Sequence, residues 1–348
     1  MSQGTQDQNL TPNEGTDSQS SNPRLWLNIV LFIATFFTTT VAGVQWIGKN
    51  PFELTNLSYG LPYSISILLV LGVHEFGHYF AARFHQVKVT LPFFIPFPPT
   101  PFFLNFGTLG ALIRTKAAIP SRKAMFDIGV AGPLAGFIAC VILLTIGFLT
   151  LPDRSYILAI HPSYDFLTHS TNESQGLPLE FGQTLLYRFL SWALSDPGRQ
   201  FVPPMSEIYH YPLLCVGWFG LFVTAMNLIP IGQYDGGHIS YTMLGNRHRT
   251  VARTSFATLL ILGLPSVIDT ILREALGYFT NAYPDQIIPY AQYSWSGWFL
   301  WALISFYVVK LDHPPVYDET PLDSRRLVIG WITFAVFVLC FSFSPFTI

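Results

Sequence analysis

The chain has 348 residues, of which 50% are hydrophobic, 16% are aromatic and only 11% are charged. Soluble domains carry about 25% charged residues, and several apolar runs of this chain reach or approach the roughly 20 residues that cross a bilayer as a helix. This composition excludes an ordinary soluble domain, and a net charge of −2 without a basic stripe argues against a nucleic-acid partner.

The N-terminal residues 1–23 contain almost no large apolar side chain, so we expect a disordered tail. The tail includes acids, and no Lys or Arg occurs before Arg24, which is unlike a transit peptide or a signal sequence. The apolar run that follows is too long for a cleaved signal, and we expect it to anchor the chain in a membrane.

Seven apolar runs are predicted membrane spans. They lie at 25–46, 61–84, 125–151, 213–230, 251–272, 295–309 and 327–343. The expected fold is therefore an all-α polytopic membrane protein with about six to seven transmembrane helices. In the alternative, one short run such as 251–272 does not span, which would reverse the orientation of everything after it.

Basic residues gather in two of the segments between these runs. They are Lys88, Arg114, Lys116, Arg122 and Lys123 in the acid-free segment 85–123, and Arg247, Arg249 and Arg253 after the fourth run. The positive-inside rule makes both segments cytoplasmic. It places the tail in the cytoplasm, and the loop 152–211 and the C-terminus outside.

The second run contains His74-Glu75-Phe76-Gly77-His78. Residues four apart share one face of a helix, so His74 and His78 can bind one Zn²⁺ at about 2.0–2.1 Å each. Glu75 points roughly 100° away, where it can take a proton from a metal-bound water. His74 and His78 are about 14 and 7 Å of helix rise from Arg83, which predicts a metal within the membrane, nearer the cytoplasmic face. The alternative is a buried polar cluster held by hydrogen bonds between helices.

The segment after the second run is apolar but cannot be helical, because it contains Pro92, Pro96, Pro98, Pro99 and Pro101. We expect a re-entrant or interfacial loop there, followed by a strand-like stretch at 107–116, so that a small membrane-embedded β-hairpin lies beside the site. A free strand edge could pair with an extended peptide. Equally, the hairpin could only plug the membrane face.

The third run opens with a face of small residues, Gly129, Gly132 and Gly136, which predicts close helix packing rather than chemistry. Asp127 is expected to pair with Arg122 or Lys123.

The loop 152–211 is shorter than a typical domain of about 100–150 residues, so it is expected to cap the outer face or to screen substrates. His161, His169 and His210 in this loop have no metal-ligand spacing, and we interpret them as surface histidines.

A second polar stretch covers 227–238, where Pro230 and Gly232 should break the fourth run. A catalytic zinc site needs three protein ligands, and Asp235 is the best candidate because it lies on the same side of the membrane as the two histidines. Gly236-Gly237 would let the backbone come close. The alternatives are that Asp-Gly is only a turn, or that His238 is the ligand.

Together, three motifs resemble those of the site-2 protease family of intramembrane zinc metalloproteases, peptidase M50. They are His74-Glu75-x-x-His78, Gly132-Pro133-Leu134-Ala135-Gly136 and Asn227-x-x-Pro230-x-x-x-x-Asp235-Gly236-Gly237. The run 107–136 is similar to the bacterial, cyanobacterial and plastid branch of the family. The resemblance covers about 61–249, within a single expected metalloprotease domain at 24–348.

The resemblance implies one Zn²⁺ per chain held by His74, His78 and Asp235, with Glu75 as general base and Asn227 near the scissile peptide. It implies transmembrane protein substrates cut in or beside the bilayer, as in regulated intramembrane proteolysis. Gly232 departs from the family, where many members have a second proline. The loop 152–211 is too short for the PDZ domain that some members insert there.

Two other functions use the same polar cluster: a membrane metal transporter, and an inactive scaffold of the same fold. A transporter should have polar residues on several spans, whereas here they gather at one depth on two spans. Every expected catalytic residue type is present, which argues against the scaffold. The expected location is a bacterial plasma membrane, or a thylakoid membrane if the source is cyanobacterial. The sequence predicts no oligomeric state.

Overall fold

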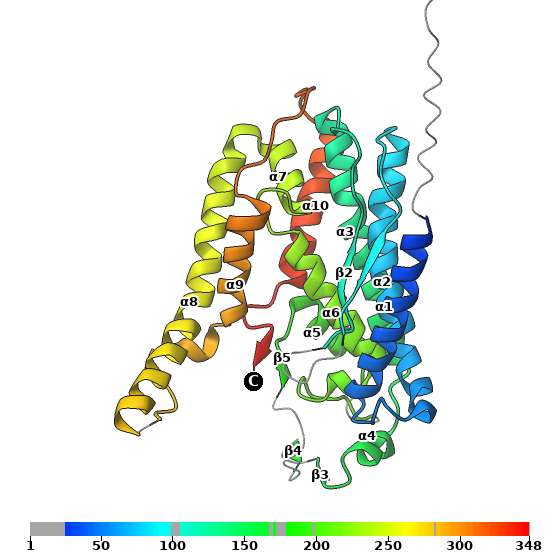
Figure 1. Ribbon diagram of the computed structural model, residues 1–348, viewed down its shortest axis with the longest axis vertical. Coiled ribbons are helices and arrows are strands. Elements are labelled where there is room, and N and C mark those ends of the chain that lie inside the picture. The colour runs from blue at the N-terminus through cyan, green and yellow to red at the C-terminus, as the bar shows by residue number, and fades with distance from the viewer. Residues whose placement is uncertain are drawn as a thin grey trace, which may run out of the picture.

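The computed structural model describes residues 25–98, 105–166, 170–171, 179–196, 198, 200–281 and 283–347, which are mostly α-helical (Figure 1). The predicted tail 1–23 lies outside these residues. Four helical stretches, 25–46, 54–84, 122–149 and 235–280, are long and apolar enough to cross a membrane by length and composition. A helical membrane protein is thus confirmed at this level, while the count of six to seven spans stays a prediction.

The first three long helices form one side of the bundle. Helix α1 covers Leu25–Trp46, α2 covers Leu57–Phe84 after a 3₁₀ turn at Leu54–Asn56, and α3 covers Arg122–Leu149. Helix α2 packs between α1 and α3. The bounds of α1 match the prediction, and α2 begins four residues earlier than predicted.

The predicted β-hairpin is present between α2 and α3. Strand β1 (Phe93–Pro96) pairs antiparallel with β2 (Thr108–Leu112), with an irregularity between Phe94 and Pro96. The hairpin packs on α1, where Asn28 donates to the Pro92 carbonyl at 2.8 Å and Thr38 donates to the Gly107 carbonyl at 2.6 Å. Pro99 and Pro101 of the predicted re-entrant or interfacial loop lie outside the described residues.

The pairing expected for Asp127 was wrong. Its carboxylate accepts from Arg326 Nη2 at 2.7 Å and lies 2.8 Å from His85 Nε2, whereas Arg122 pairs with Glu319 at 3.1 Å. Arg326 is far away in the chain but lies in the first turn of α10 (Ser324–Cys340), which packs beside α3. Local spacing along the sequence could not reveal this partner.

The loop 152–211 gathers at the end of the bundle where α1 ends and α2 begins (Figure 1). Its elements are α4 (Arg154–Ile160), β3 (Tyr164–Asp165), β4 (Ser170–Thr171), β5 (Glu180–Phe181), α5 (Leu185–Leu194) and a 3₁₀ turn, η2 (Ile208–His210). Strand β5 pairs antiparallel with β6 (Phe346–Thr347), which ties the end of the chain to this loop.

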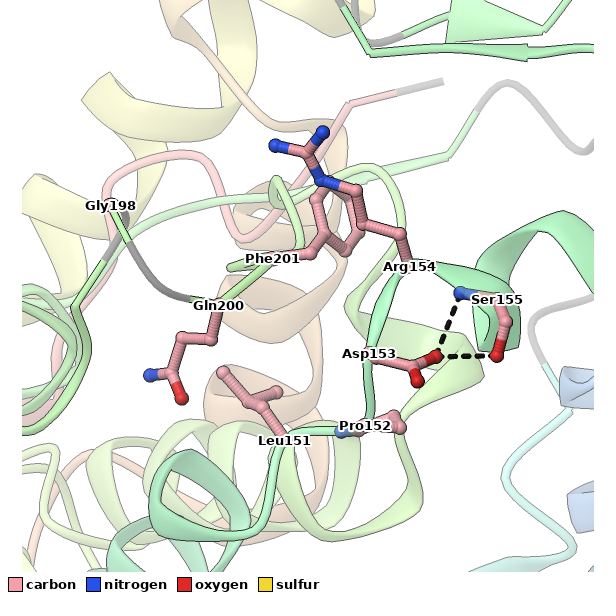
Figure 2. Close-up of a pocket in the computed structure, with 8 residues that line it drawn as sticks. All are labelled: Leu151, Pro152, Asp153, Arg154, Ser155, Gly198, Gln200 and Phe201. Atoms are coloured by element: carbon pink, nitrogen blue, oxygen red, sulfur yellow. Dashed lines mark hydrogen bonds between the residues drawn. The ribbon is translucent and has the colours of Figure 1, made fainter.

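An open pocket of about 630 Å³ lies beside the start of α4 (Figure 2). Asp153 caps the helix, because its Oδ1 accepts from the Ser155 amide at 2.9 Å. The remaining lining residues are Leu151, Pro152, Arg154, Ser155, Gly198, Gln200 and Phe201.

The second half of the chain forms the other side of the bundle. Its elements are α6 (Pro212–Asn227), α7 (Asp235–Leu244), η3 (Gly245–Arg247), α8 (His248–Thr280), η4 (Ala291–Tyr293), α9 (Ser296–Ile304), a π-helical turn at Ser305–Val309, and α10. The predicted break after the fourth run is confirmed, since α6 ends at Asn227 and helix resumes at Asp235.

Large apolar side chains remain exposed on the outer helices. Trp26 of α1 is 65% exposed, Ile261 of α8 is 71% exposed and Trp331 of α10 is 61% exposed. Extended apolar surface of this kind is rare on soluble monomers and marks contact with a membrane or a partner. It agrees with helices that face lipid.

Candidate metal centre

Helix α2 places His74 and His78 one turn apart, so their rings lie on one face. The two Nε2 atoms are 3.1 Å apart, and both residues are buried, at 6% and 7% exposure. The Nδ1–H of His78 donates to the Ile128 carbonyl of α3 at 2.7 Å. This bond leaves the Nε2 lone pair of His78 available to a cation.

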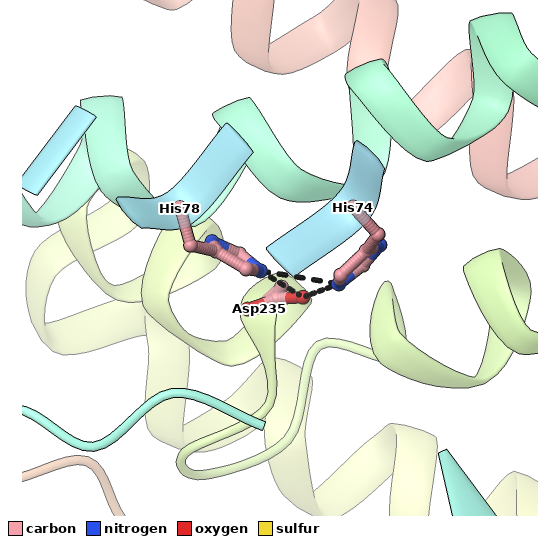
Figure 3. Close-up of side chains that lie close together, drawn as sticks. All are labelled: His74, His78 and Asp235. Atoms are coloured by element: carbon pink, nitrogen blue, oxygen red, sulfur yellow. Dashed lines mark hydrogen bonds and ion pairs between the residues drawn. The ribbon is translucent and has the colours of Figure 1, made fainter. Parts of the chain in front are cut away.

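Helix α7 brings Asp235 to the two rings. Its Oδ2 lies 3.5 Å from His74 Nε2 and 3.3 Å from His78 Nε2, and Figure 3 shows the three side chains converging. Asp235 is the first residue of α7, directly after the segment in which the chain turns back from α6. The structure therefore brings the two histidines of the first polar stretch together with Asp235 of the second.

The three distances fit one small cation. Tetrahedral ligands at 2.0–2.1 Å from Zn²⁺ are about 3.3 Å from one another. The observed separations of 3.1, 3.5 and 3.3 Å bracket that value. Two imidazoles and one carboxylate are a zinc donor set that leaves the fourth position open for water or substrate.

Small residues of α3 allow the rings this position. A Cβ added at Gly132 would overlap the His78 ring, at 2.5 Å from Cε1 and closer to Nε2. A Cβ at Gly136 would lie 3.2 Å from the Nδ1 of His74, and one at Gly77 would lie 2.6 Å from the Ala131 carbonyl oxygen. The predicted packing role of this face is confirmed, and the packing holds the site.

Glycines also shape the turn that carries Asp235. A Cβ at Gly236 would overlap the Leu228 carbonyl, and one at Gly237 would lie 2.5 Å from the Ile231 oxygen. Gly232 has a positive φ of 50°, and its α-carbon faces the Lys310 carbonyl so closely that a side chain would overlap it. A second proline at this position would not fit, which explains the departure noted in the sequence.

Two further predicted residues border the three donors. Glu75 is 8% exposed, and its carboxyl lies near the main chain of Ile113, directly after β2. Asn227, the last residue of α6, has its Nδ2 3.3 Å from His74 Nε2. The hairpin and α6 thus flank the centre.

His238, the rival ligand, belongs to a different group. Its Nδ1 lies 2.7 Å from the Nε2 of His313, whose ring stacks on Tyr241. Burial and the neighbouring His238 lower the pKa of His313 to about 4. The sequence did not single out His313, because its partner His238 lies 75 positions away in the chain. It did not single out the main chains of Ile113 and Ile128, because backbone groups carry no residue-type signal.

Comparisons with known proteins agree on one family. Residues 62–264 match the family model of Peptidase family M50. A probable zinc metalloprotease EGY2, chloroplastic, from Arabidopsis thaliana is 30% identical over 238 residues, which cover 68% of this chain and 38% of that protein. A probable zinc metalloprotease EGY1, chloroplastic, from Oryza sativa subsp. japonica is 34% identical over 248 residues, covering 63% and 38%.

A more distant relative, the probable zinc metallopeptidase EGY3, chloroplastic, from Arabidopsis thaliana, is 26% identical over 259 residues, covering 73% of this chain and 42% of that protein. The match with each of these relatives spans less than half of the relative's length. No solved structure matches the chain.

Proposed function

The chain belongs to peptidase family M50, and we propose that it is an intramembrane zinc metalloendopeptidase that hydrolyses peptide bonds of transmembrane proteins. The family is the one that the motifs of the sequence predicted. The observation that carries the activity is the triangle of two imidazole nitrogens and one carboxylate oxygen, with sides of 3.1, 3.3 and 3.5 Å, inside a helical bundle.

His74, His78 and Asp235 are proposed to hold one Zn²⁺. Bound there, the ion would supply Lewis-acid chemistry, polarising a peptide carbonyl and lowering the pKa of a water. The Ile128 carbonyl fixes the His78 ring, and the glycines of α3 let that ring lie between the two helices.

Glu75 is proposed as the general base. It takes a proton from the attacking water and returns it to the leaving nitrogen. Its place one residue after His74, outside the donor triangle, lets it reach a water beside the metal without acting as a ligand. Because Glu75 is only 8% exposed, few bulk waters can reach its carboxylate and exchange protons with it during the reaction.

Asn227 and the hairpin are proposed to position the substrate. The Asn227 amide borders His74 and can donate a hydrogen bond to a peptide carbonyl. Strand β2 ends beside Glu75, and Leu109 of this strand is 67% exposed. A peptide unwound from its helix could pair with this edge and present its backbone to the centre.

We also propose seven membrane passes within one domain at 24–348, whose catalytic core is about 61–249. The described chain starts in the upper part of the bundle and finishes in its lower half, beside β5 of the loop 152–211 (Figure 1), as an odd number of passes requires. Helices α6 and α7 together make one pass, with the turn carrying Asp235 in the middle. The active site then opens to the cytoplasmic side, and the loop 152–211 lies outside.

A photosynthetic membrane is the favoured location, because the relatives' names place those proteins in chloroplasts. It was the alternative to a bacterial plasma membrane. The transporter and the inactive scaffold are not favoured, since the polar groups gather in one cluster that contains every expected catalytic residue type.

The test is Glu75→Gln with Glu53→Gln as control, because Glu53 is exposed on a loop away from the centre. We expect Glu75→Gln to keep its zinc and to lose cleavage of a transmembrane substrate by about 10²–10⁴-fold, while the control cleaves normally. Unchanged cleavage would refute the assigned base. Loss of zinc would instead make Glu75 a ligand and contradict the proposed donor set. Comparing membrane-protein fragments in wild-type and Glu75→Gln cells would identify the substrates.

A further inference from the structure

We propose that His161, Glu207 and His210 form a second metal site, for a divalent transition-metal ion of the zinc type, at the end of the bundle opposite the start of α1. The three residues come from the loop 152–211. His161 directly follows α4, Glu207 directly precedes η2, and His210 ends η2. The prediction that these histidines lie on the surface was wrong for His210, which is 3% exposed, and His169 lies outside the described residues.

The donor atoms form a triangle like that of the first centre. The Nε2 atoms of His161 and His210 are 2.9 Å apart, and Glu207 Oε2 lies 3.7 Å and 3.5 Å from them. These separations scatter around the roughly 3.3 Å that tetrahedral ligands keep around Zn²⁺. Two imidazoles and one carboxylate form a donor set that suits zinc and leaves one position open.

The surroundings orient His210 for ligation. Its Nδ1–H donates to the carbonyl of Trp46, the last residue of α1, at 2.6 Å. The Nε2 lone pair then points at the triangle. His78 is held in the same way by the Ile128 carbonyl, so both sites use a buried main-chain oxygen to fix the tautomer of one ligand.

The charge balance of the site also calls for a cation. Glu207 is 5% exposed, and its Oε2 accepts no hydrogen bond among the described residues. Its ion-pair contacts there are the two imidazoles. Buried carboxylates are normally paired with a charge or bound to a metal, and a divalent ion would satisfy this one while both rings stay neutral.

The two sites are distinct. Helix α2 begins at the end of the bundle where α1 finishes, and about 25 Å of helix rise separates Leu57 from His74. An ion at the second site would join the end of α1, the end of α4 and η2 before α6. It would fix the loop on the bundle from the side opposite the proposed catalytic opening.

The test is metal counting on the purified full chain in detergent, saturated with Zn²⁺ and then dialysed. We expect about two ions in the wild type, and about one in Glu207→Gln, in His161→Gln and in the pair His74→Ala with His78→Ala. Glu180→Gln, a nearby exposed carboxylate of β5, should keep about two. The zinc retained at the first centre in the loop variants shows that they have folded.

The counts separate this proposal from the proposed function. A single ion that is lost in the His74/His78 variant and unaffected by Glu207→Gln refutes the second site and leaves the protease assignment standing. A single ion with the opposite dependence refutes the first centre instead.

A direct measurement does not depend on the folding of the loop variants. Zinc X-ray absorption of the His74→Ala/His78→Ala chain should show two imidazoles and oxygen ligands at about 2.0–2.1 Å. An imidazole-free zinc spectrum would overturn the assignment.

Discussion

Substituting Gly132 by alanine should weaken metal binding without touching a proposed ligand. The new methyl group would lie 2.5 Å from Cε1 of His78 and closer to its Nε2. Carbon atoms pack at about 3.5 Å or more, so the ring or helix α3 must move by about 1 Å. The ring cannot turn freely, because its Nδ1–H is bonded to the Ile128 carbonyl.

Two opposing effects decide the size of the change. Alanine favours a helix over glycine by about 1 kcal/mol, whereas overpacking costs about 1–3 kcal/mol. Metal–ligand distances tolerate only about 0.2 Å, so a 1 Å shift damages the centre even if the helix survives. We expect zinc affinity to fall about tenfold to hundredfold, equivalent to about 1.4–2.7 kcal/mol, with cleavage falling alongside.

The assay is competition for zinc with a chelator of known affinity, together with cleavage of a transmembrane substrate. Gly72→Ala is the matched control, since it lies on α2 and its new methyl group would meet Phe94 at an ordinary 3.8 Å. It should keep wild-type affinity. If Gly132→Ala binds zinc as tightly as Gly72→Ala does, the close approach of α3 to His78 is not what shapes the centre.

Three further predictions concern the same region. Asp235→Asn should lower zinc affinity at least about tenfold, and unchanged affinity would remove the residue from the donor set. In the wild type, zinc should be released as the pH falls, because protons compete for the histidine and carboxylate ligands. A chelator titration at several pH values measures both effects. Gly236→Ala should lower the unfolding temperature and zinc content together, because its methyl group would overlap the Leu228 carbonyl; an unchanged melting curve would contradict the tight turn. Asp127→Asn should destabilise the chain by about 1 kcal/mol, since it weakens a partly exposed pair with Arg326. Asp127 also pairs with His85 and Arg326 with Asp323, so the Asp127–Arg326 coupling is measured by a double-mutant cycle with Arg326→Gln in a denaturation series; the double variant should lose less stability than the sum of the two single variants, and strict additivity would contradict the pair.

The sequence predicted those features that depend on spacing along one element. The pair His74 and His78 could be placed on one helix face because residues four apart stack. The breaks at Pro230 and Gly232, and the packing face of Gly132, followed from backbone chemistry in the same way. For Asp235 the sequence could not decide between a zinc ligand and a residue of a simple turn, because its role depends on where α7 packs relative to α2.

The features that the sequence did not predict join distant parts of the chain. Asp127 meets Arg326 across 199 positions, which no local spacing shows. His161 and His210 were dismissed because their spacing is not that of a metal motif, and Glu207 was not considered as a ligand, yet folding brings the three together. The number of membrane passes depends on short helices such as α9, for which composition alone does not decide between crossing and lying at the surface.

The main-chain carbonyl of Lys310 packs directly against Gly232. This contact shows how much of the chain is needed to hold the turn that carries Asp235. The family match stops at residue 264, although the main chain that confines the Asp235 turn follows the π-helical turn after α9. A protein truncated at residue 264 would keep every proposed catalytic side chain. It would still lose the Lys310 main chain that packs against the turn carrying Asp235. Engineering or inhibitor work on this protein should therefore begin from a chain that extends past α9.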